Sequence, residues 1–175
     1  MDLEDFLKAH KNSILPRWLD SLFEVYPPGS HEFLRKKKDR FANPVGYSLT
    51  VELERLYDEI ASQASEKEIE QTLDSIMRIR AVQDLRPSEA VRFILDLKKI
   101  VNEELRSSTG GQDSGLAVRD FDQKMDSMCL EGFDIYSKCR QKIFDIRVNE
   151  VKRQVSRLME RANLVCDIPD TVEDL

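Results

Sequence analysis

A charged side chain interrupts an apolar helical face in the middle of the sequence. Ile69, Leu73 and Ile76 follow the three- and four-residue spacing of one helix face, and its next steps fall on Arg80 and then Gln83. A polar group on a core-facing position needs a partner. Two interpretations stay open: Arg80 pairs with an acid or caps a neighbouring helix end, or it helps to hold a ligand.

Other basic residues are candidates for contact with a partner. Arg78 lies two residues before Arg80 and therefore on another face, where it meets solvent or a second protein. The basic run from Arg35 to Arg40 contacts an acidic partner or forms a solvated turn.

Motifs for catalysis or cofactor binding are not found. The sequence has no glycine-rich phosphate loop, no nucleophile elbow and no zinc-protease motif. A haem protein of helical type needs an axial imidazole on a core-facing position, whereas His10 and His31 fall near segment boundaries. We therefore expect no enzymatic activity, no cofactor and no metal.

Cysteine number bears on compartment and redox state. Cys129, Cys139 and Cys166 are an odd number without metal-ligand spacing, which predicts reduced thiols. Core packing and redox sensing both stay open for Cys129 and Cys139.

Composition favours one helical domain. The 175 residues are 41% hydrophobic and 34% charged, with only six glycines and six prolines. The net charge of -6 argues against nucleic-acid binding by the whole surface. The longest apolar runs are too short for a membrane span, and the acidic amino terminus is unlike a signal peptide. We expect a cytoplasmic protein.

Start and stop signals divide the chain into helices. The spacing predicts a helix over 2–10 and a second one, with Pro16 in its first turn. The second helix is expected to end at Tyr26, where Pro27, Pro28 and Gly29 stop it. Residues 31–41 form a short helix or a loop.

The central helices have clearer signals. Asn43 with Pro44 predicts a capped helix start, and Ser65 with Glu68 a capping box. The helix from Ser65 is expected to run to about 83, and the next from Pro87 to about 106. Residues 107–115 have the composition of a flexible loop.

The last expected helix spans 116–163. Its second half resembles a heptad seam flanked by basic residues, and a helix that outlasts its own domain usually pairs with a partner. The candidate dimer-helix residues are Ile143, Val151, Val155 and Leu158. We expect one domain over 1–163, in which 136–163 form the dimer or output helix, and an acidic flexible tail over 164–175.

Two stretches of the sequence are distinctive together. They are Asp39-Arg40-Phe41-Ala42-Asn43-Pro44-Val45-Gly46-Tyr47 and Ile76-Met77-Arg78-Ile79-Arg80-Ala81-Val82-Gln83-Asp84, the latter followed by Pro87-Ser88-Glu89-Ala90. These stretches resemble the amino-terminal domain of RsbRD-type stressosome proteins, the co-antagonists of the RsbT kinase. The resemblance covers roughly residues 3–107. It implies an all-α, globin-like bundle without haem, which dimerises and sends a long helix towards a STAS domain. This sequence stops at Leu175 without room for such a domain, so we expect a stand-alone bacterial sensor or adaptor.

Two functional hypotheses follow. The first is a non-enzymatic regulatory module that forms a homodimer through the carboxy-terminal half of the long helix and contacts a signalling partner. The second is a sensor that binds a small molecule or haem between the central helices, motivated by Arg80 and Gln83.

Overall fold

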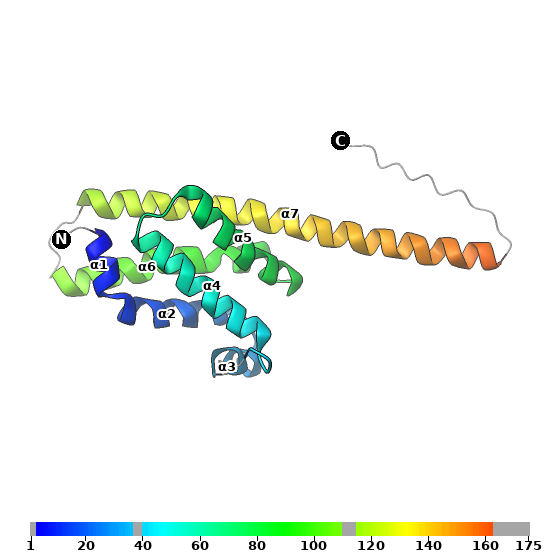
Figure 1. Ribbon diagram of the computed structural model, residues 1–175, viewed down its shortest axis with the longest axis horizontal. Helices are drawn as coiled ribbons and strands as arrows, with labels where there is room; N and C mark the ends of the chain where they lie inside the picture. Colours follow the sequence, from blue (N-terminus) through cyan, green and yellow to red (C-terminus); the bar gives the residue numbers. More distant parts are fainter. Residues whose placement is uncertain (1–2, 37–39, 110–114, 163–175) are drawn as a thin grey trace. The chain divides into compact units, whose positions relative to one another are not determined.

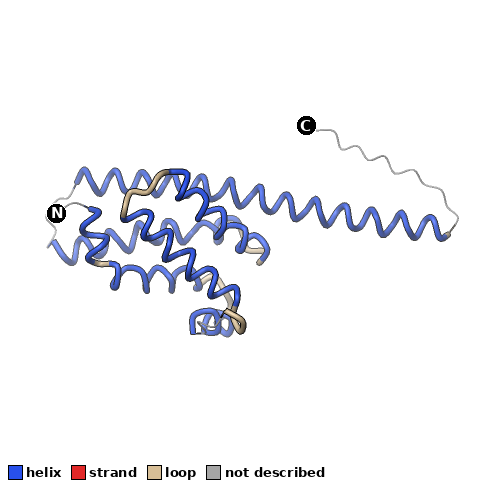
Figure 2. The backbone as a smooth tube through the Cα atoms, in the orientation of Figure 1, coloured by secondary structure: helices blue, strands red, loops and turns tan. Residues whose placement is uncertain are grey.

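The computed structural model describes residues 3–36, 40–109 and 115–162, and every regular element in these ranges is a helix (Figures 1 and 2). The helices are α1 (Leu3–Ala9), α2 (Lys11–Phe23), α3 (Pro28–Lys36), α4 (Pro44–Ala61), α5 (Glu66–Val82), α6 (Pro87–Thr109) and α7 (Gly115–Arg161). The expected all-α fold with a long carboxy-terminal helix is confirmed. The expected tail over 164–175 lies outside the described residues.

The chain divides into two compact units, and α7 contributes to both. Unit 1 is Met1–Cys139 and unit 2 is Arg140–Leu175. Unit 1 contains α1 to α6 and the first half of α7, whereas the described part of unit 2 is the second half of α7.

The amino-terminal helices differ from the expectation in two places. Pro16 lies inside α2 and not in its first turn, because the carbonyl of His10 accepts from Ser13 and Ile14 and so starts the helix early. Pro16 lies on the exposed side of α2, where a missing amide donor is least costly. The helix ends at Phe23 rather than Tyr26, and Pro28 begins α3 instead of only terminating α2.

The start of α4 confirms the predicted cap. The Asn43 side chain accepts from the Gly46 amide at 2.9 Å and donates to the carbonyls of Leu34 and Phe33. A Cβ atom at Gly46 would lie 2.2 Å from Asn43 Nδ2 and 2.5 Å from the Leu34 oxygen. Only glycine therefore lets the Asn43 cap join α4 to the end of α3.

The α5 start is also as predicted, since Ser65 and Glu68 form both halves of a capping box. The helix ends at Val82, and α6 runs to Thr109, three residues beyond the expected end. Asp84, in the turn between them, has a left-handed φ of 60°. Several side chains from other helices converge on this turn.

Trp18 on α2 is central to the core of unit 1. Its side chain is fully buried, its indole Nε1 donates to the Phe93 carbonyl at 2.7 Å, and its ring packs against Tyr57 and Phe93. In addition α2 packs on α6, and α4 on both α5 and α1 (Figure 1). The core thus joins helices that are distant in sequence.

The first half of α7 packs closely on α5 and α6 at a glycine. A Cβ atom at Gly132 would lie 2.9 Å from Met77 Cε and 3.2 Å from Ile94 Cδ1. Nearby, Lys98 on α6 donates to both carboxylate oxygens of Asp126 on α7 at 2.9 Å. A single glycine inside a long helix is therefore explained by close packing.

Candidate functional site

Arg80 on α5 is a fully buried cation held by backbone oxygens. Its guanidinium donates to the carbonyls of Ala90 at 3.0 Å, Leu22 at 3.3 Å and Glu89 at 2.9 Å, and lies 5.4 Å from the centre of the Phe93 ring. Burial lowers the pKa of Arg80, while Tyr26 and Tyr136 oppose this shift. An arginine nevertheless stays protonated in proteins. This arrangement caps the carboxyl end of α2, which corresponds to the interpretation of Arg80 as a residue that caps a neighbouring helix end.

Two tyrosine side chains next to Arg80 form hydrogen bonds with the turn between α5 and α6. Tyr26, which follows α2, donates to the side-chain oxygen of Gln83, and Tyr136 on α7 donates to the carbonyl of Leu85. Burial raises the pKa of Tyr26. We call Arg80, Tyr26, Gln83 and Tyr136 the Arg80 cluster. It ties α2, α5, α6 and the first half of α7 to one turn.

The remaining predicted residues are not brought together with Arg80. Arg78 is exposed on α5 and forms an ion pair with Asp74 one turn earlier at 2.5 Å. Arg40 is exposed in the turn before α4. Asn43 and Pro44 start α4 as cap and first helical residue, so both have a structural explanation. Whether any of the candidate residues contacts a ligand or a partner stays a prediction.

Neither histidine is placed as a cofactor ligand in the two pockets described below. His10 is stacked on Phe6 and bonded through Nδ1 to its carbonyl, whereas His31 has a buried Nε2 without a hydrogen-bond partner. The side chains of Cys129 and Cys139 are half-buried, and burial raises the pKa of Cys129. Cys166 lies outside the described residues. Among those residues no cluster of metal-ligating side chains occurs.

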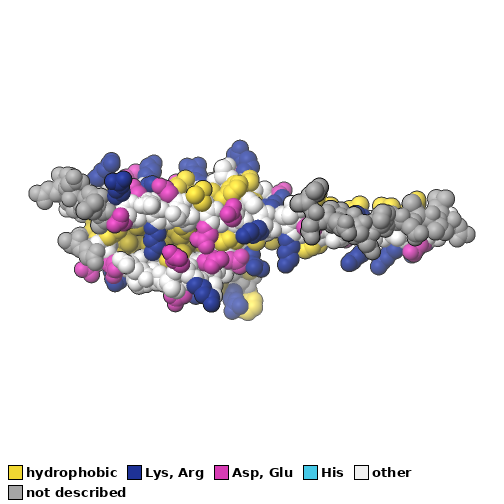
Figure 3. Space-filling model, turned by 90° about the horizontal axis from the view of Figure 1, so that it is seen from above, with side chains coloured by type: hydrophobic (Ala, Val, Ile, Leu, Met, Phe, Trp, Pro, Cys, Tyr) yellow, Lys and Arg dark blue, Asp and Glu magenta, His cyan; other side chains and the backbone are white. Residues whose placement is uncertain are grey.

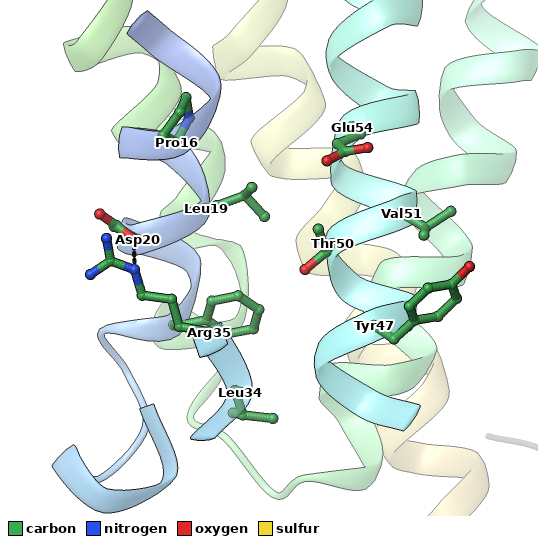
Figure 4. Close-up of a pocket in the computed structure, with 10 residues that line it drawn as sticks. Pro16, Leu19, Asp20, Leu34, Arg35, Tyr47, Thr50, Val51 and Glu54 are labelled. Atoms are coloured by element: carbon green, nitrogen blue, oxygen red, sulfur yellow. Dashed lines mark ion pairs between the residues drawn. The ribbon is translucent and has the colours of Figure 1, made fainter. Parts of the chain in front are cut away.

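A groove of about 320 Å³ lies among α2, α3 and α4 (Figure 4). Its apolar lining comes from all three helices and consists of Pro16, Leu19, Phe23, Leu34, Tyr47 and Val51. Its polar lining is Asp20, Arg35, Thr50 and Glu54. In Figure 4 Leu19 points from α2 towards α4, while Thr50 and Glu54 point from α4 towards α2. The sequence pattern gave no sign of this groove, because its residues come from three separate segments.

The charged groups of the groove are unequally satisfied. Arg35 is bound to Asp20 by an ion pair of 2.9 Å, and Thr50 donates to the Gly46 carbonyl. Glu54 is exposed and makes no hydrogen bond or ion pair with any described residue. A second pocket, lined by residues of α1, the end of α4 and α7 such as Leu7, Ile60 and Phe121, has a volume of about 400 Å³. Neither Arg80 nor Gln83 lines either pocket.

The described part of unit 2 is a helix with an exposed apolar seam. Phe144, Val151, Val155 and Leu158 are exposed to 60, 58, 42 and 63%. Together with Val148 they repeat at alternating steps of four and three residues. Figure 3 shows hydrophobic side chains together with Lys and Arg side chains along this part of α7.

The register of this seam refines the list of candidate dimer residues. One residue corresponds to about 100° of helix rotation, so Ile143 lies about a quarter turn from Phe144 and outside the four-and-three repeat. The part of Ile143 in a dimer stays a prediction. Ile146 is 59% exposed on the opposite face of the helix.

None of the helices in the described ranges has a segment that is long and apolar enough to cross a membrane. No curated protein and no solved structure matches the chain. The globin-like character of the bundle therefore stays a prediction. Residues 12–151 match the family described as the RsbT co-antagonist protein rsbRD N-terminal domain. The match covers most of both the bundle and α7, and the chain belongs to this family of regulatory signalling domains.

Proposed function

We propose that this chain is a non-catalytic regulatory module that acts as a homodimer and contacts a protein of a signalling pathway. The exposed seam of unit 2 carries the proposal. Val151 and Leu158 leave more than half of their side chains open to solvent, although they repeat with the spacing of a coiled coil. A helix with such a stripe gains free energy when a second helix covers it.

A second copy of the chain is the partner that needs no further assumption. In a two-stranded coiled coil, Phe144, Val151 and Leu158 would occupy one heptad position, and Val148 and Val155 the other. Valine at one of these positions, with phenylalanine, valine and leucine at the other, fits paired helices. The family membership supports a regulatory role, and the cytoplasmic location expected from the sequence stays a prediction.

Sedimentation equilibrium of the whole chain tests the assembly. We expect a dimer at tens of micromolar protein, and a monomer at that concentration would contradict the proposal. Affinity capture from the native cell with and without unit 2, residues 140–175, tests the output. If both forms capture the same signalling protein, its contact lies in unit 1. If the truncated form no longer captures it, the contact lies in unit 2.

The alternative function, a sensor that binds a small molecule or haem between the central helices, stays a prediction. The hypothesis was motivated by Arg80 and Gln83. The guanidinium of Arg80 donates to the carbonyls of Leu22, Glu89 and Ala90, and the side-chain oxygen of Gln83 accepts from Tyr26. They are thus better explained as structural. A haem-binding form would show a Soret band on addition of haem. Because Arg80→Ala should also destabilise the fold, the ligand affinity of this variant would have to be measured together with its free energy of unfolding.

A further inference from the structure

We propose that the groove among α2, α3 and α4 binds a small organic cation, namely a primary ammonium group attached to an apolar body. This site is distinct from the Arg80 cluster, and it does not depend on the dimer proposed above. The groove is lined mainly by apolar side chains and carries a few polar groups at its borders. That combination is typical of small-molecule sites.

The charges of the groove select the sign of the ligand. Among the described residues that line the groove, the only cation is Arg35, and its guanidinium is already bound to Asp20 at 2.9 Å. An anionic ligand would therefore have to compete with an intramolecular carboxylate. Glu54, by contrast, has no bonded partner among the described residues. A cation gains an ion pair with Glu54 without breaking one.

The geometry places an apolar body beside that carboxylate. Glu54 points from α4 towards α2, and Leu19 points from α2 into the same gap (Figure 4). Leu34 and Phe23 belong to the same apolar lining. A ligand with its ammonium at Glu54 would thus lay its apolar body along Leu19, Phe23 and Leu34. The volume of about 320 Å³ is at the lower end of ligand pockets, which fits one ring with a short chain.

Three probes with the same phenylbutyl body and different head groups test this assignment: phenylbutylamine, phenylbutanol and phenylpentanoate. Isothermal titration calorimetry of the whole chain measures each affinity. We expect saturable binding of the amine, with the alcohol weaker and the carboxylate weaker by about tenfold, a difference of about 1.4 kcal/mol. Equal affinities for amine and carboxylate would overturn the proposal, as would no saturable binding of the amine.

Variants locate the site. Glu54→Gln should weaken amine binding about threefold to fivefold, as for a partly exposed ion pair, and leave the alcohol unchanged. Val51→Trp, at an exposed position of the lining, should fill the groove and weaken both ligands by about tenfold or more. Glu70→Gln, on the exposed surface of α5, is the matched control and should have no effect.

These variants also separate the outcomes. Amine binding that resists both Glu54→Gln and Val51→Trp would show that the ligand sits elsewhere, and the assignment would be wrong. The oligomeric state of the same samples reports on the seam of unit 2 alone. A negative result for ligand binding therefore does not contradict the proposed dimer, and a monomer does not contradict the proposed ligand site.

Discussion

Arg80 on α5 donates a hydrogen bond of 3.3 Å to the carbonyl of Leu22, near the carboxy-terminal end of α2. The carbonyls in the last turn of a helix lack intrahelical donors, and a cation at that end also interacts favourably with the helix dipole. The other two carbonyls bound by Arg80 lie in the first turn of α6. One buried side chain therefore joins the ends of three helices.

Replacing Arg80 should be costly even when the charge is kept. Lysine lacks the planar fork that reaches three carbonyls at once, so Arg80→Lys should lower the free energy of unfolding by about 2–3 kcal/mol. Arg78→Lys, at an exposed position two residues away, is the control and should change it by less than about 0.5 kcal/mol. Urea unfolding measures both, and similar values for the two would show that the carbonyl contacts are unimportant.

A methyl group at Gly46 should disrupt the junction between α3 and α4. It would collide with the Asn43 amide and the Leu34 carbonyl, so Gly46→Ala should cost about 2–3 kcal/mol through lost capping and overpacking. Gly29→Ala, near the start of α3, meets no atom within 4 Å and should be close to neutral. Thermal unfolding of the pair would contradict the account if Gly46→Ala were tolerated equally well.

Stability should fall in alkaline solution because of Tyr57. Burial raises the pKa of this phenol above its ordinary value of 10.0, and its hydroxyl donates to the Leu7 carbonyl at 2.8 Å. The protonated phenol thus stabilises the fold fully below pH 10, and this contribution is lost as the pH rises towards the folded pKa. Between about pH 9 and pH 11, wild type should lose more stability than Tyr57→Phe. An identical loss in urea unfolding would exclude Tyr57 as a cause.

Salt should strengthen the proposed dimer. Between Arg140 and Ala162 the helix carries seven basic and three acidic residues, so two paired copies repel each other. Added sodium chloride screens this repulsion, and the dissociation constant from sedimentation should fall between low and physiological ionic strength. A dimer that dissociates on addition of salt would indicate an attractive ionic interface in place of the apolar seam.

Local signals were the part of the fold that sequence could predict. The caps at Asn43 and Ser65 depend on side chains three residues from the amides that they bind, and the structure confirms both. The end of α2 was predicted at Tyr26 because Pro27 and Pro28 follow it, but Pro28 begins α3, and Tyr26 continues the apolar spacing while it binds Gln83 from outside the helix. The spacing of apolar residues alone does not distinguish a helix end from a packed turn.

Long-range contacts explain what the sequence could not show. The break in the apolar stripe indicated a special role for Arg80, but its acceptors are carbonyls, which every residue has. The groove is assembled from residues as far apart as Leu19 and Glu54, and neither has a distinctive neighbour pattern. Tyr136 likewise reaches the Leu85 carbonyl across 51 positions of sequence.

The central claim is that the second half of α7 pairs with a second copy through the seam that contains Val155. Sedimentation equilibrium of two charge variants tests it most directly: Val155→Glu within the seam and Ile146→Glu on the opposite side of the same helix, where the residue is also exposed. The account predicts that Val155→Glu is a monomer at protein concentrations where wild type and Ile146→Glu are dimers. A dimer of Val155→Glu as stable as that of Ile146→Glu would contradict it.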